Sequence, residues 1–541
     1  MEGKMSFAQK FGAFSHKLFG TKPNDGDVQP KEAWSYGITG VGQNFICTII
    51  GSYLTVFMTD ALGFNNDIKL GVLTASVAVA ILMLVARIFD ALNDPIMGSV
   101  VDYTRTKYGK CRPYLLWMPI PIGILTILCF LPVYPRDMSG FLACGLIYVV
   151  WSVAYTIADV PYWGLSTTMT NNTTKRGNIL TIVRLMCTAG AGIVTLFVPI
   201  LTDAVTAKYR DGNGLLIAQY ADQYMETLQW TYFIVAVVLV VISIPLFYIG
   251  FKNTKERFGT VASGEKQRSL GQNLKLLFKN DQVVLVVLSG ILGGARMVYT
   301  YTGGLYFCKY ALGSESAYSV LTMLVIPGGL IASVLCPWLT KKFTKKWSFI
   351  GSHILGAAAM VLMLFMWDFE NGKFIGGGEY GTAGLVVAVI CMIIVGIPQG
   401  IANIMSYAMI GDTVEYLEWK TGERAEGICF SMQTFISKIG MAFGAFIGVL
   451  AYNMSGINSN DPSATMTVDG LNDLWLMLVL SSAISFIACV IPLFFYHITE
   501  DKQRWYVAEI QKRKEAEAEE QALALANAGA AEAEIDIEIK E

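Results

Sequence analysis

The stretch TLQWTYFIVAVVLVVISIPLFYIG, residues 227–250, contains 24 residues and no charged side chain. An α-helix of this length rises far enough to cross the roughly 30 Å hydrocarbon core of a bilayer. Comparable apolar blocks recur along the chain and, with this one, cover approximately residues 34–58, 69–99, 113–132, 139–168, 178–202, 227–250, 282–308, 315–340, 347–367, 381–411, 427–454 and 471–497. The sequence therefore predicts an all-α membrane protein with about twelve transmembrane helices.

The overall composition supports the same prediction. Of the 541 residues, 54% are hydrophobic and only 15% are charged, whereas a soluble protein carries about 25% charged residues. The net charge of -2 gives no indication of nucleic-acid binding, and the basic residues fall in short clusters between apolar blocks. The N-terminal segment lacks an apolar region before a cleavage site, so we expect the first helix itself to direct insertion.

Lysine and arginine are unevenly distributed among the loops, which predicts the orientation of the helices. The first loop, around residues 59–68, and the last, around residues 453–473, contain neither residue. The basic residues gather in the N-terminal segment and the even-numbered loops, at Lys4, Lys10, Lys17, Lys22, Lys31, Arg105, Lys107, Lys110, Arg112, Lys175, Arg176, Lys341, Lys342, Lys345 and Lys346. By the positive-inside rule, we expect a multi-pass protein of the plasma (inner) membrane with both termini in the cytoplasm.

A hydrophilic stretch between the sixth and seventh blocks divides the chain into two halves. Related polar loops follow the fourth and tenth blocks, at residues 174–177 and 421–424, which is the weak internal symmetry expected of two bundles that move about a central site. We therefore expect a cytoplasmic N-terminal segment, a six-helix bundle, a cytoplasmic middle loop, a second six-helix bundle and a cytoplasmic tail, over residues 1–33, 34–250, 251–281, 282–497 and 498–541.

The second block carries acidic residues at membrane depth. Asp90, Asn93 and Asp94 stand at positions i, i+3 and i+4, so their oxygens share one helical face. Inserting an ionisable group at the bilayer centre costs about 2.5 kcal/mol or more of free energy, so the presence of such residues there requires an explanation. Two carboxylates and an amide suit Na+, and either carboxylate alone could carry a proton. The structural alternative is that Asp90 pairs with Arg87 or another buried base, while Asp94 caps the helix near Pro95.

The fourth block carries residues suited to a sugar. Tyr155, Asp159 and Trp163 are spaced by four and share a face. A carboxylate accepts hydrogen bonds from two ring hydroxyls, and an indole packs against the apolar face of a pyranose. Thr156 is turned partly toward the next helix, where its hydroxyl could add to the cation site. The alternative for Trp163 is an anchor at the membrane interface.

Two buried bases lie in later blocks, Arg184 in the fifth and Lys438 in the eleventh. Arg184 could neutralise Asp159 in the empty site and donate a pair of hydrogen bonds to a substrate. Lys438 could lie near the aspartates of the second helix. The alternative for both is a fixed structural ion pair. Arg296 in the seventh block has no acidic partner at helical spacing, and we leave it unassigned.

At these residues the sequence resembles the glycoside-pentoside-hexuronide:cation symporter family of the major facilitator superfamily. The matching segments extend from about Trp34 to Tyr496 and are Val85 to Gly98, Thr104-Arg105, Gly109 to Pro113, Tyr155 to Trp163, Arg184, Asp412 to Tyr416, Ser431 to Thr434 and Lys438. The segments Val85 to Gly98 and Tyr155 to Trp163 are highly specific. The resemblance implies a major facilitator fold of two six-helix bundles.

The resemblance also implies a role for each candidate residue. The residues that would hold the coupling cation, Na+ or H+, are Asp90, Asn93, Asp94 and Thr156. The residues that would contact the sugar are Tyr155, Asp159, Trp163 and Arg184. Lys438 would organise the cation site. In the melibiose-transporting branch the first helix supplies a Lys-Asp pair, which falls here on Gln43-Asn44, and a tryptophan of the tenth helix falls near Asn403. The sugar specificity of that branch therefore does not transfer.

The predicted function is secondary active transport, with no enzyme activity and no cofactor beyond the coupling ion. We expect a monomer that takes up a sugar or glycoside, with Na+ favoured over H+, by alternating access between the two halves. Neutral sugars are favoured, because Asp159 would partly repel an acidic one. The basic loops at residues 105–112 and 420–424 could pair with Asp102 or Glu415 when the cytoplasmic side is closed. The alternatives are a cation-coupled lipid or amphiphile carrier and a non-transporting membrane sensor.

Overall fold

A computed structural model describes residues 28–64, 69–70, 73–170, 173–210, 216–257, 270–300, 302–377, 380–423, 426–456, 466–517 and 519. Within these residues, ten helical segments are long and apolar enough to cross a membrane, and two shorter apolar helices, Pro119–Cys129 and Ser316–Ala332, occupy the places of the third and eighth predicted spans. The predicted all-α fold with about twelve spans is therefore confirmed. Parts of the predicted N-terminal segment, middle loop and tail lie outside the described residues.

The first half contains six spans. They are α2 (Pro30–Thr48) continued through η1 (Ile49–Tyr53), α3 (Leu54–Val56) and η2 (Phe57–Ala61); α4 (Ala75–Tyr103); α5 (Arg112–Trp117) with α6 (Pro119–Cys129); α7 (Met138–Met169); α8 (Thr173–Thr206); and α9 (Ala221–Asn253). Two short 3-10 turns, η3 (Ala207–Tyr209) and η4 (Ala218–Tyr220), and a small antiparallel hairpin, β1 (Lys69–Leu70) with β2 (Leu73–Thr74), lie in the loops.

The second half repeats this plan after α10 (Leu270–Lys279). Its spans are α11 (Asp281–Leu292) continued through η5 (Gly294–Thr300) and α12 (Thr302–Ala311); the two parts of α13 (Ser316–Phe365); α14 (Thr382–Thr421); α15 (Glu426–Met454); and α16 (Val468–Ala488) with α17 (Val490–Phe494). A second hairpin, β3 (Trp367–Asp368) with β4 (Lys373–Phe374), joins α13 to α14. A further helix covers residues 500–517.

The element α13 contains two helices that meet at Thr344. This residue has φ 66° and ψ 162°, a backbone conformation that residues with a side chain rarely adopt. The break falls inside the predicted basic loop between the eighth and ninth blocks. The apolar pattern therefore placed the boundary correctly, although the helical geometry resumes almost at once on either side.

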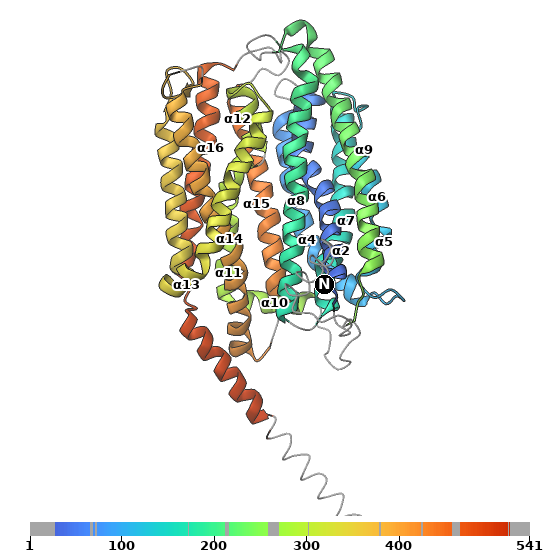
Figure 1. Cartoon of the computed structure of the whole chain (residues 1–541), viewed down its shortest axis with the longest axis vertical. Coiled ribbons are helices and arrows are strands. Elements are labelled where there is room, and N and C mark those ends of the chain that lie inside the picture. Colours follow the sequence, from blue (N-terminus) through green and yellow to red (C-terminus); the bar gives the residue numbers. More distant parts are fainter. Residues whose placement is uncertain are drawn as a thin grey trace, which may run out of the picture.

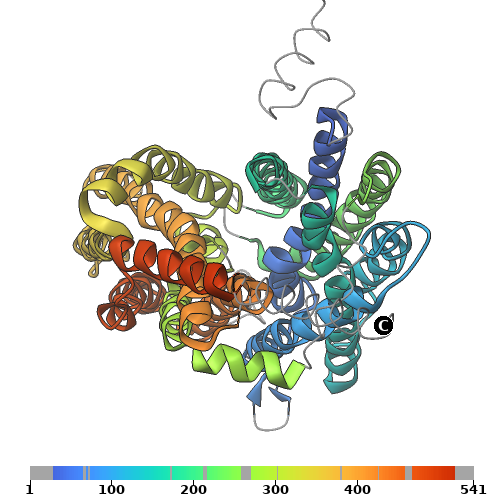
Figure 2. The same cartoon turned by 90° about the horizontal axis from the view of Figure 1, so that it is seen from below.

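The two halves form separate groups of helices that run side by side. Figure 2 views the molecule from one end and places the first half, coloured blue to green, opposite the second half, coloured yellow to red. The helix over 500–517 and α10 lie at the same end, which we call the lower end (Figure 1). α10 packs against both α4 of the first half and α15 of the second.

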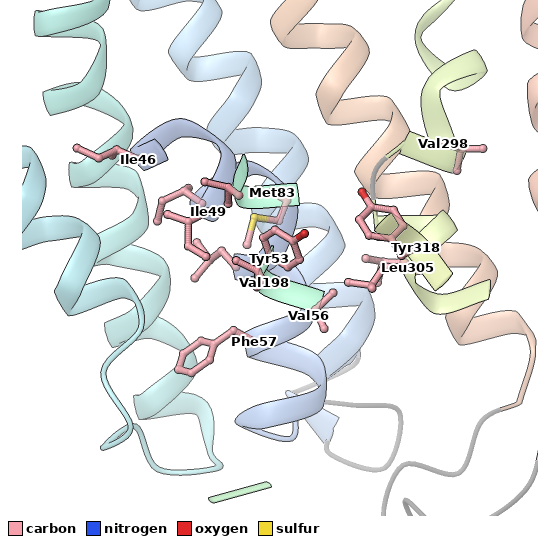
Figure 3. Close-up of a cluster of buried hydrophobic side chains, with 14 of the residues drawn as sticks. Ile46, Ile49, Tyr53, Val56, Phe57, Met83, Val198, Val298, Leu305 and Tyr318 are labelled. Atoms are coloured by element: carbon pink, nitrogen blue, oxygen red, sulfur yellow. The ribbon is translucent and has the colours of Figure 1, made fainter. Parts of the chain in front are cut away.

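An apolar core extends across both halves. Figure 3 shows Tyr53 and Val56 of the first span near Leu305 and Tyr318 of the second half. All four side chains are at most 1% exposed and belong to one buried cluster. A second buried cluster, around Met405 and nearer the lower end, contains residues of the second half only. The continuous part of the core therefore joins the halves away from the lower end.

Candidate functional site

The two acidic residues of α4 meet a lysine from the other half. Asp90 and Asp94 are 2% and 7% exposed. Lys438, from α15, lies with its Nζ 2.5 Å from Asp94 Oδ1 and 3.3 Å from Asp90 Oδ2. Asp94 Oδ2 is buried and accepts no hydrogen bond from the described residues. The group therefore joins the halves and leaves one carboxylate oxygen as a free acceptor.

Thr156 of α7 completes this group. Its hydroxyl donates a hydrogen bond to Asp90 Oδ1, and Arg87 Nη1 lies 3.9 Å from Asp90 Oδ2. The structural alternative for Asp90, a contact with a buried base, is thus present together with the predicted cluster. Asn93 is partly buried on the same helix.

The alternative for Asp94, a helix cap near Pro95, is wrong. α4 continues through this proline to Tyr103, so Asp94 lies inside the helix and its carboxylate is available to the group.

The oxygens of this group suit a hard monovalent cation. Two carboxylates and a hydroxyl are ligands typical of such ions, whereas softer metals prefer nitrogen and sulfur. No set of three or more His, Cys, Asp and Glu side chains gathers as a metal site anywhere in the described part of the chain. Lys438 supplies the positive charge that the two carboxylates require in a buried place.

A second polar group lies along the same helix, α7. Asp159 is 7% exposed, and its Oδ1 accepts hydrogen bonds from Gln43 Nε2 of α2 and from Trp163 Nε1, the latter at 3.1 Å. Gln43 Oε1 is buried without a hydrogen-bond partner among the described residues. Because Thr156 precedes Asp159 by three residues, neighbouring positions of one helix contribute to both groups.

Arg184 does not pair with Asp159, contrary to our expectation. Its guanidinium carbon lies 4.2 Å from the centre of the Trp163 ring, and Nη2 donates a 2.5 Å hydrogen bond to the hydroxyl of Tyr407 in α14. None of the described carboxylates lies within ion-pair distance of Arg184. Arg184 instead contacts the Trp163 ring and Tyr407, while Asp159 Oδ1 accepts from the Trp163 indole and the Gln43 amide.

The remaining predicted sugar-site residues differ in how they are placed. Tyr155 is buried and stacks on Trp151, with ring centres 5.0 Å apart and planes 16° apart. Asn44 donates its amide to the backbone oxygen of Gly40 in its own helix. Asn403 is exposed on α14, one turn before Tyr407. Tyr407 was missed by sequence reasoning; its only signal was the spacing of four residues from Asn403.

Arg296, which had no predicted partner, lies within the second half. Its Nε donates to Gln399 Oε1 at 3.3 Å, and its Nη1 lies 3.5 Å from His353 Nε2. His353 is buried and stacks on Phe349. These contacts link three spans of one half, so the residue supports the packing of that half.

Polar contacts close the end of the molecule opposite the lower end, which we call the upper end. Asp60, at the end of the first span, pairs with Lys309 of α12. Glu315 is 1% exposed; its oxygens accept a 2.8 Å hydrogen bond from Thr202 and lie 3.4 Å from Lys309 Nζ. The Asp60–Lys309 and Thr202–Glu315 contacts each join one half to the other.

Further contacts reinforce the closure of the upper end. Asp203 Oδ1 accepts a 2.8 Å bond from Arg210, while its Oδ2 accepts a 2.9 Å bond from Ser314 of the second half. Ser319 donates to the backbone oxygen of Thr195 at 3.1 Å. The upper end is therefore held together by a mostly buried network of acids, bases and hydroxyls.

At the lower end, the described ion pairs stay within one half. Lys345 Nζ lies 2.6 Å from Asp412 Oδ2, and Lys420 Nζ lies 2.6 Å from Asp281 Oδ1. Glu415 accepts a hydrogen bond from Gln503 of the C-terminal helix. The expected pairing of the basic loops with Asp102 or Glu415 stays a prediction for a state closed at this end. Arg424 and the side chain of Asp102 lie outside the described residues.

Comparisons with known proteins agree with this architecture. The model of the MFS/sugar transport protein family matches residues 35–500. The isoprimeverose transporter of Lactiplantibacillus pentosus is 29% identical over 472 residues, covering 86% of this chain and 88% of that one. The glucuronide carrier protein homolog of Escherichia coli K12 is 26% identical over 482 residues, covering 89% and 95%. The raffinose carrier protein of Pediococcus pentosaceus is 25% identical over 488 residues, covering 88% and 71%.

Solved structures share the fold. A D-xylose-proton symporter superposes with a TM-score of 0.52 at 14% identity, covering 84% of this chain and 96% of that one. A bacterial homolog of the lysosomal transporter Spinster, in an inward-facing and unoccupied conformation, superposes with a TM-score of 0.53 at 14% identity, covering 89% and 96%. At these identities the likeness shows the fold alone. The family model covers most of the chain, and the protein belongs to the MFS/sugar transport protein family.

Proposed function

We propose that this transporter couples the uptake of a sugar or glycoside to the entry of a cation, with the α4 acids as the cation site and Asp159 at the sugar site. The observation that carries the proposal is the buried cluster of Asp90, Asp94 and Thr156, from two helices, in which Asp94 Oδ2 accepts no hydrogen bond from the described residues. Carboxylate oxygens are typical ligands of hard cations, so this open acceptor in the cluster supports a cation as its ligand.

Na+ is the favoured cation. The oxygens of Asp90, Asp94 and Thr156 would hold it, with Asn93 as a further ligand, and it would take over part of the charge neutralisation that Lys438 now supplies. The Lys438 Nζ is 2.5 Å from Asp94 Oδ1, so cation entry must weaken this contact between the halves. A proton on one carboxylate would have a similar effect, and H+ is the second candidate.

The substrate proposal follows from the polar group on α7 and α8. Both described bonds of Asp159 fall on Oδ1, so Oδ2 can accept hydrogen bonds from two sugar hydroxyls. Gln43 and Asn403 are amides that could read further hydroxyls. The named relatives transport isoprimeverose and raffinose, which supports a neutral glycoside.

A hexuronide is the second substrate class. Arg184 has no carboxylate within ion-pair distance among the described residues, and a guanidinium matches a carboxylate in geometry and charge. The relative from Escherichia coli is named as a glucuronide carrier homolog. Both classes therefore enter the uptake test.

The transport cycle is proposed to be alternating access between the two halves. The contacts that close the upper end support a state open toward the lower end. By the Lys and Arg distribution, that end faces the cytoplasm, with both termini, in the plasma (inner) membrane, and the protein acts as a monomer. Cation and sugar would enter together when the upper-end network opens.

The test is uptake by the purified protein in proteoliposomes. Isoprimeverose, lactose, raffinose and methyl glucuronide are offered as labelled substrates under an inward Na+ gradient, an inward proton gradient or neither. We expect at least one of these sugars to accumulate against its gradient only when a cation gradient is imposed. If no sugar accumulates while a lysolipid is transported, the amphiphile carrier replaces this proposal.

A further inference from the structure

We propose that Tyr407 is a positioning residue of the sugar site, which holds the guanidinium of Arg184 so that its remaining N–H groups face the substrate. This inference rests on the proposed function and adds a residue from the second half to the site. Its central observation is the 2.5 Å hydrogen bond from Arg184 Nη2 to the Tyr407 hydroxyl, which joins α8 of one half to α14 of the other.

The guanidinium is fixed on one face and at one edge. Its carbon lies 4.2 Å from the centre of the Trp163 ring and 5.6 Å from that of Tyr407. Such contacts between a cation and an aromatic ring are attractive. A guanidinium has five N–H donors in a rigid plane, so one bond to Tyr407 and the stacking on Trp163 set the direction of the others.

Without its contact to Tyr407, the Arg184 side chain would have more conformational freedom, so this contact is important for its orientation. The described residues provide no carboxylate within ion-pair distance, and the side chain is exposed. An arginine side chain loses considerable rotamer freedom when it is held in one geometry. A site that holds it in advance spares the substrate this cost and binds more tightly.

The position of Tyr407 on α14 suits the role. It is 37% exposed, and its contact with Arg184 shows that this face of α14 looks toward the first half. Asn403, also exposed, stands one turn earlier on the same face. The helix itself is fixed within the second half by the pair between Lys345 and Asp412, where both oxygens lie within 2.7 Å of Nζ.

The contact also makes the affinity for sugar depend on the relative position of the halves. When the halves move, the bond between Arg184 and Tyr407 must lengthen or rotate, because its partners belong to different bundles. The guanidinium then presents its donors in the required direction in only part of the cycle. Tyr407 therefore links the affinity for sugar to the conformation of the protein.

The experiment compares Tyr407→Phe with the parent protein and with Tyr299→Phe. Tyr299 is a buried tyrosine of the same half whose hydroxyl has no hydrogen-bond partner among the described residues, so its variant is a matched control. Binding of isoprimeverose, lactose, raffinose and methyl glucuronide is measured by calorimetry at saturating Na+, and binding of Na+ alone is measured without sugar.

We expect Tyr407→Phe to weaken sugar binding by about threefold to tenfold, less than the loss of a charged hydrogen bond to the sugar itself, because the lost bond only orients Arg184. Na+ affinity without sugar stays at the parent value, and Tyr299→Phe changes neither. Arg184→Lys, which keeps the charge but lacks the planar group, serves as a second variant if Tyr407→Phe folds poorly. It should weaken binding of the same sugars.

A spectroscopic readout tests the contact without any substrate. The chain has 11 tryptophans, so the emission of Trp163 is obtained by subtracting the spectrum of a matching Trp163→Phe protein. Because Arg184 covers this ring, its emission should change in Tyr407→Phe and not in Tyr299→Phe. If no sugar binds to the parent protein, the proposed function fails, while this spectrum still decides the contact.

Three results would overturn the inference about Tyr407. Unchanged sugar affinity in Tyr407→Phe would show that the substrate does not use the oriented guanidinium. Weakened affinity with an unchanged Trp163 spectrum would mean that Tyr407 acts on the sugar directly and not through Arg184. Parallel loss of Na+ and sugar binding in a folded Tyr407→Phe protein would indicate a general structural role.

Discussion

At the scale of single residues, the cluster of Asp90, Asp94 and Lys438 was largely predictable, whereas the partners of Asp159 and Arg184 were not. The helical spacing of Asp90 and Asp94 was enough to expect a shared face, and α4 provides it. The partners of Asp159 come from positions distant in sequence: Gln43 precedes it by 116 residues. The Arg184 interaction with Tyr407 spans 223 residues, and no local pattern encodes such a distance. The sequence identified the acids and the lysine that the structure brings together, but it paired Arg184 with Asp159, whereas Arg184 contacts Trp163 and Tyr407.

The first prediction concerns Asp94. We expect Asp94→Asn to lower Na+ affinity at least about tenfold, because one carboxylate charge is removed from the site while Lys438 still competes for Asp90. Cation-driven accumulation of sugar should then be lost. Na+ binding by calorimetry and uptake in proteoliposomes are the measurements.

The control for this variant is Asp368→Asn on the β3–β4 hairpin. Asp368 is an acid that bonds only to its own turn, accepting a 2.7 Å hydrogen bond from Asn371. Its loss should leave Na+ binding unchanged. Parent-level accumulation by Asp94→Asn would remove Asp94 from the cation site.

The second prediction concerns Asp159. Replacement by alanine removes a buried acceptor of substrate hydroxyls, at roughly 1.5–3 kcal/mol per charged hydrogen bond, or about ten- to a hundredfold in affinity. Cation binding should largely survive, because the acids of α4 keep their contacts. Trp163→Phe should have a smaller effect, since a phenyl ring still stacks but its bond to Asp159 is lost.

Titration of these two variants with the sugar that the parent transports is the measurement. The order of effects matters as much as their size. Equal affinity in Asp159→Ala and the parent would make the acid a structural partner of Gln43 and Trp163 only.

At the scale of elements, the apolar blocks located the spans but not their true ends. The tenth block ends near residue 411, whereas α14 continues to Thr421. The extension is polar, and it remains helical because the pair between Lys420 and Asp281 and the packing of Trp419 on Tyr506 hold it in place. Hydropathy reports contact with lipid, so it cannot detect a helix that continues into water.

The third prediction tests the break at Thr344. A side chain at φ 66° and ψ 162° costs about 1 kcal/mol or more, a cost that glycine does not carry. We expect Thr344→Gly to raise the unfolding free energy by roughly 1 kcal/mol, seen as a higher melting temperature of the purified protein. Thr340→Gly, in the helix four residues earlier, should lower the unfolding free energy by a similar amount. A lower melting temperature for Thr344→Gly would show that the break is not strained.

At the scale of the whole molecule, the two-bundle plan followed from the even count of spans and the hydrophilic stretch between the sixth and seventh. The contacts between the bundles did not follow. Three of the acids involved stand at the ends of apolar blocks, namely Asp60, Asp203 and Glu315. From sequence alone, acids at such positions are interpreted as solvated charges in loops. In the folded chain they form the network that closes the upper end.

The fourth prediction concerns this network. Lys309→Gln leaves Asp60 and the buried Glu315 without their shared base, which should destabilise the closed upper end by about 1–3 kcal/mol. The population open at that end should increase accordingly. A cysteine in place of Ser319, which is 1% exposed and bonds across the halves, should then react faster with an impermeant maleimide added from outside.

Two controls accompany the labelling experiment. Lys373→Gln, on the β3–β4 hairpin, removes a positive charge outside the network and should not alter the rate. Lys309→Gln without the new cysteine gives the background from the native thiols. If the labelling rate is the same with and without Lys309, the network does not hold the halves together.

The central claim is that cation and sugar bind to two coupled groups between the two bundles. The most direct test is whether each ligand changes the affinity for the other. Na+ affinity is measured with and without the transported sugar, and sugar affinity with and without Na+, on the same purified protein. Coupling requires equal factors in the two directions, typically about 5- to 150-fold. We predict equal factors above about fivefold in the parent and none in Asp94→Asn. A sugar affinity that is independent of both Na+ and protons would contradict the account.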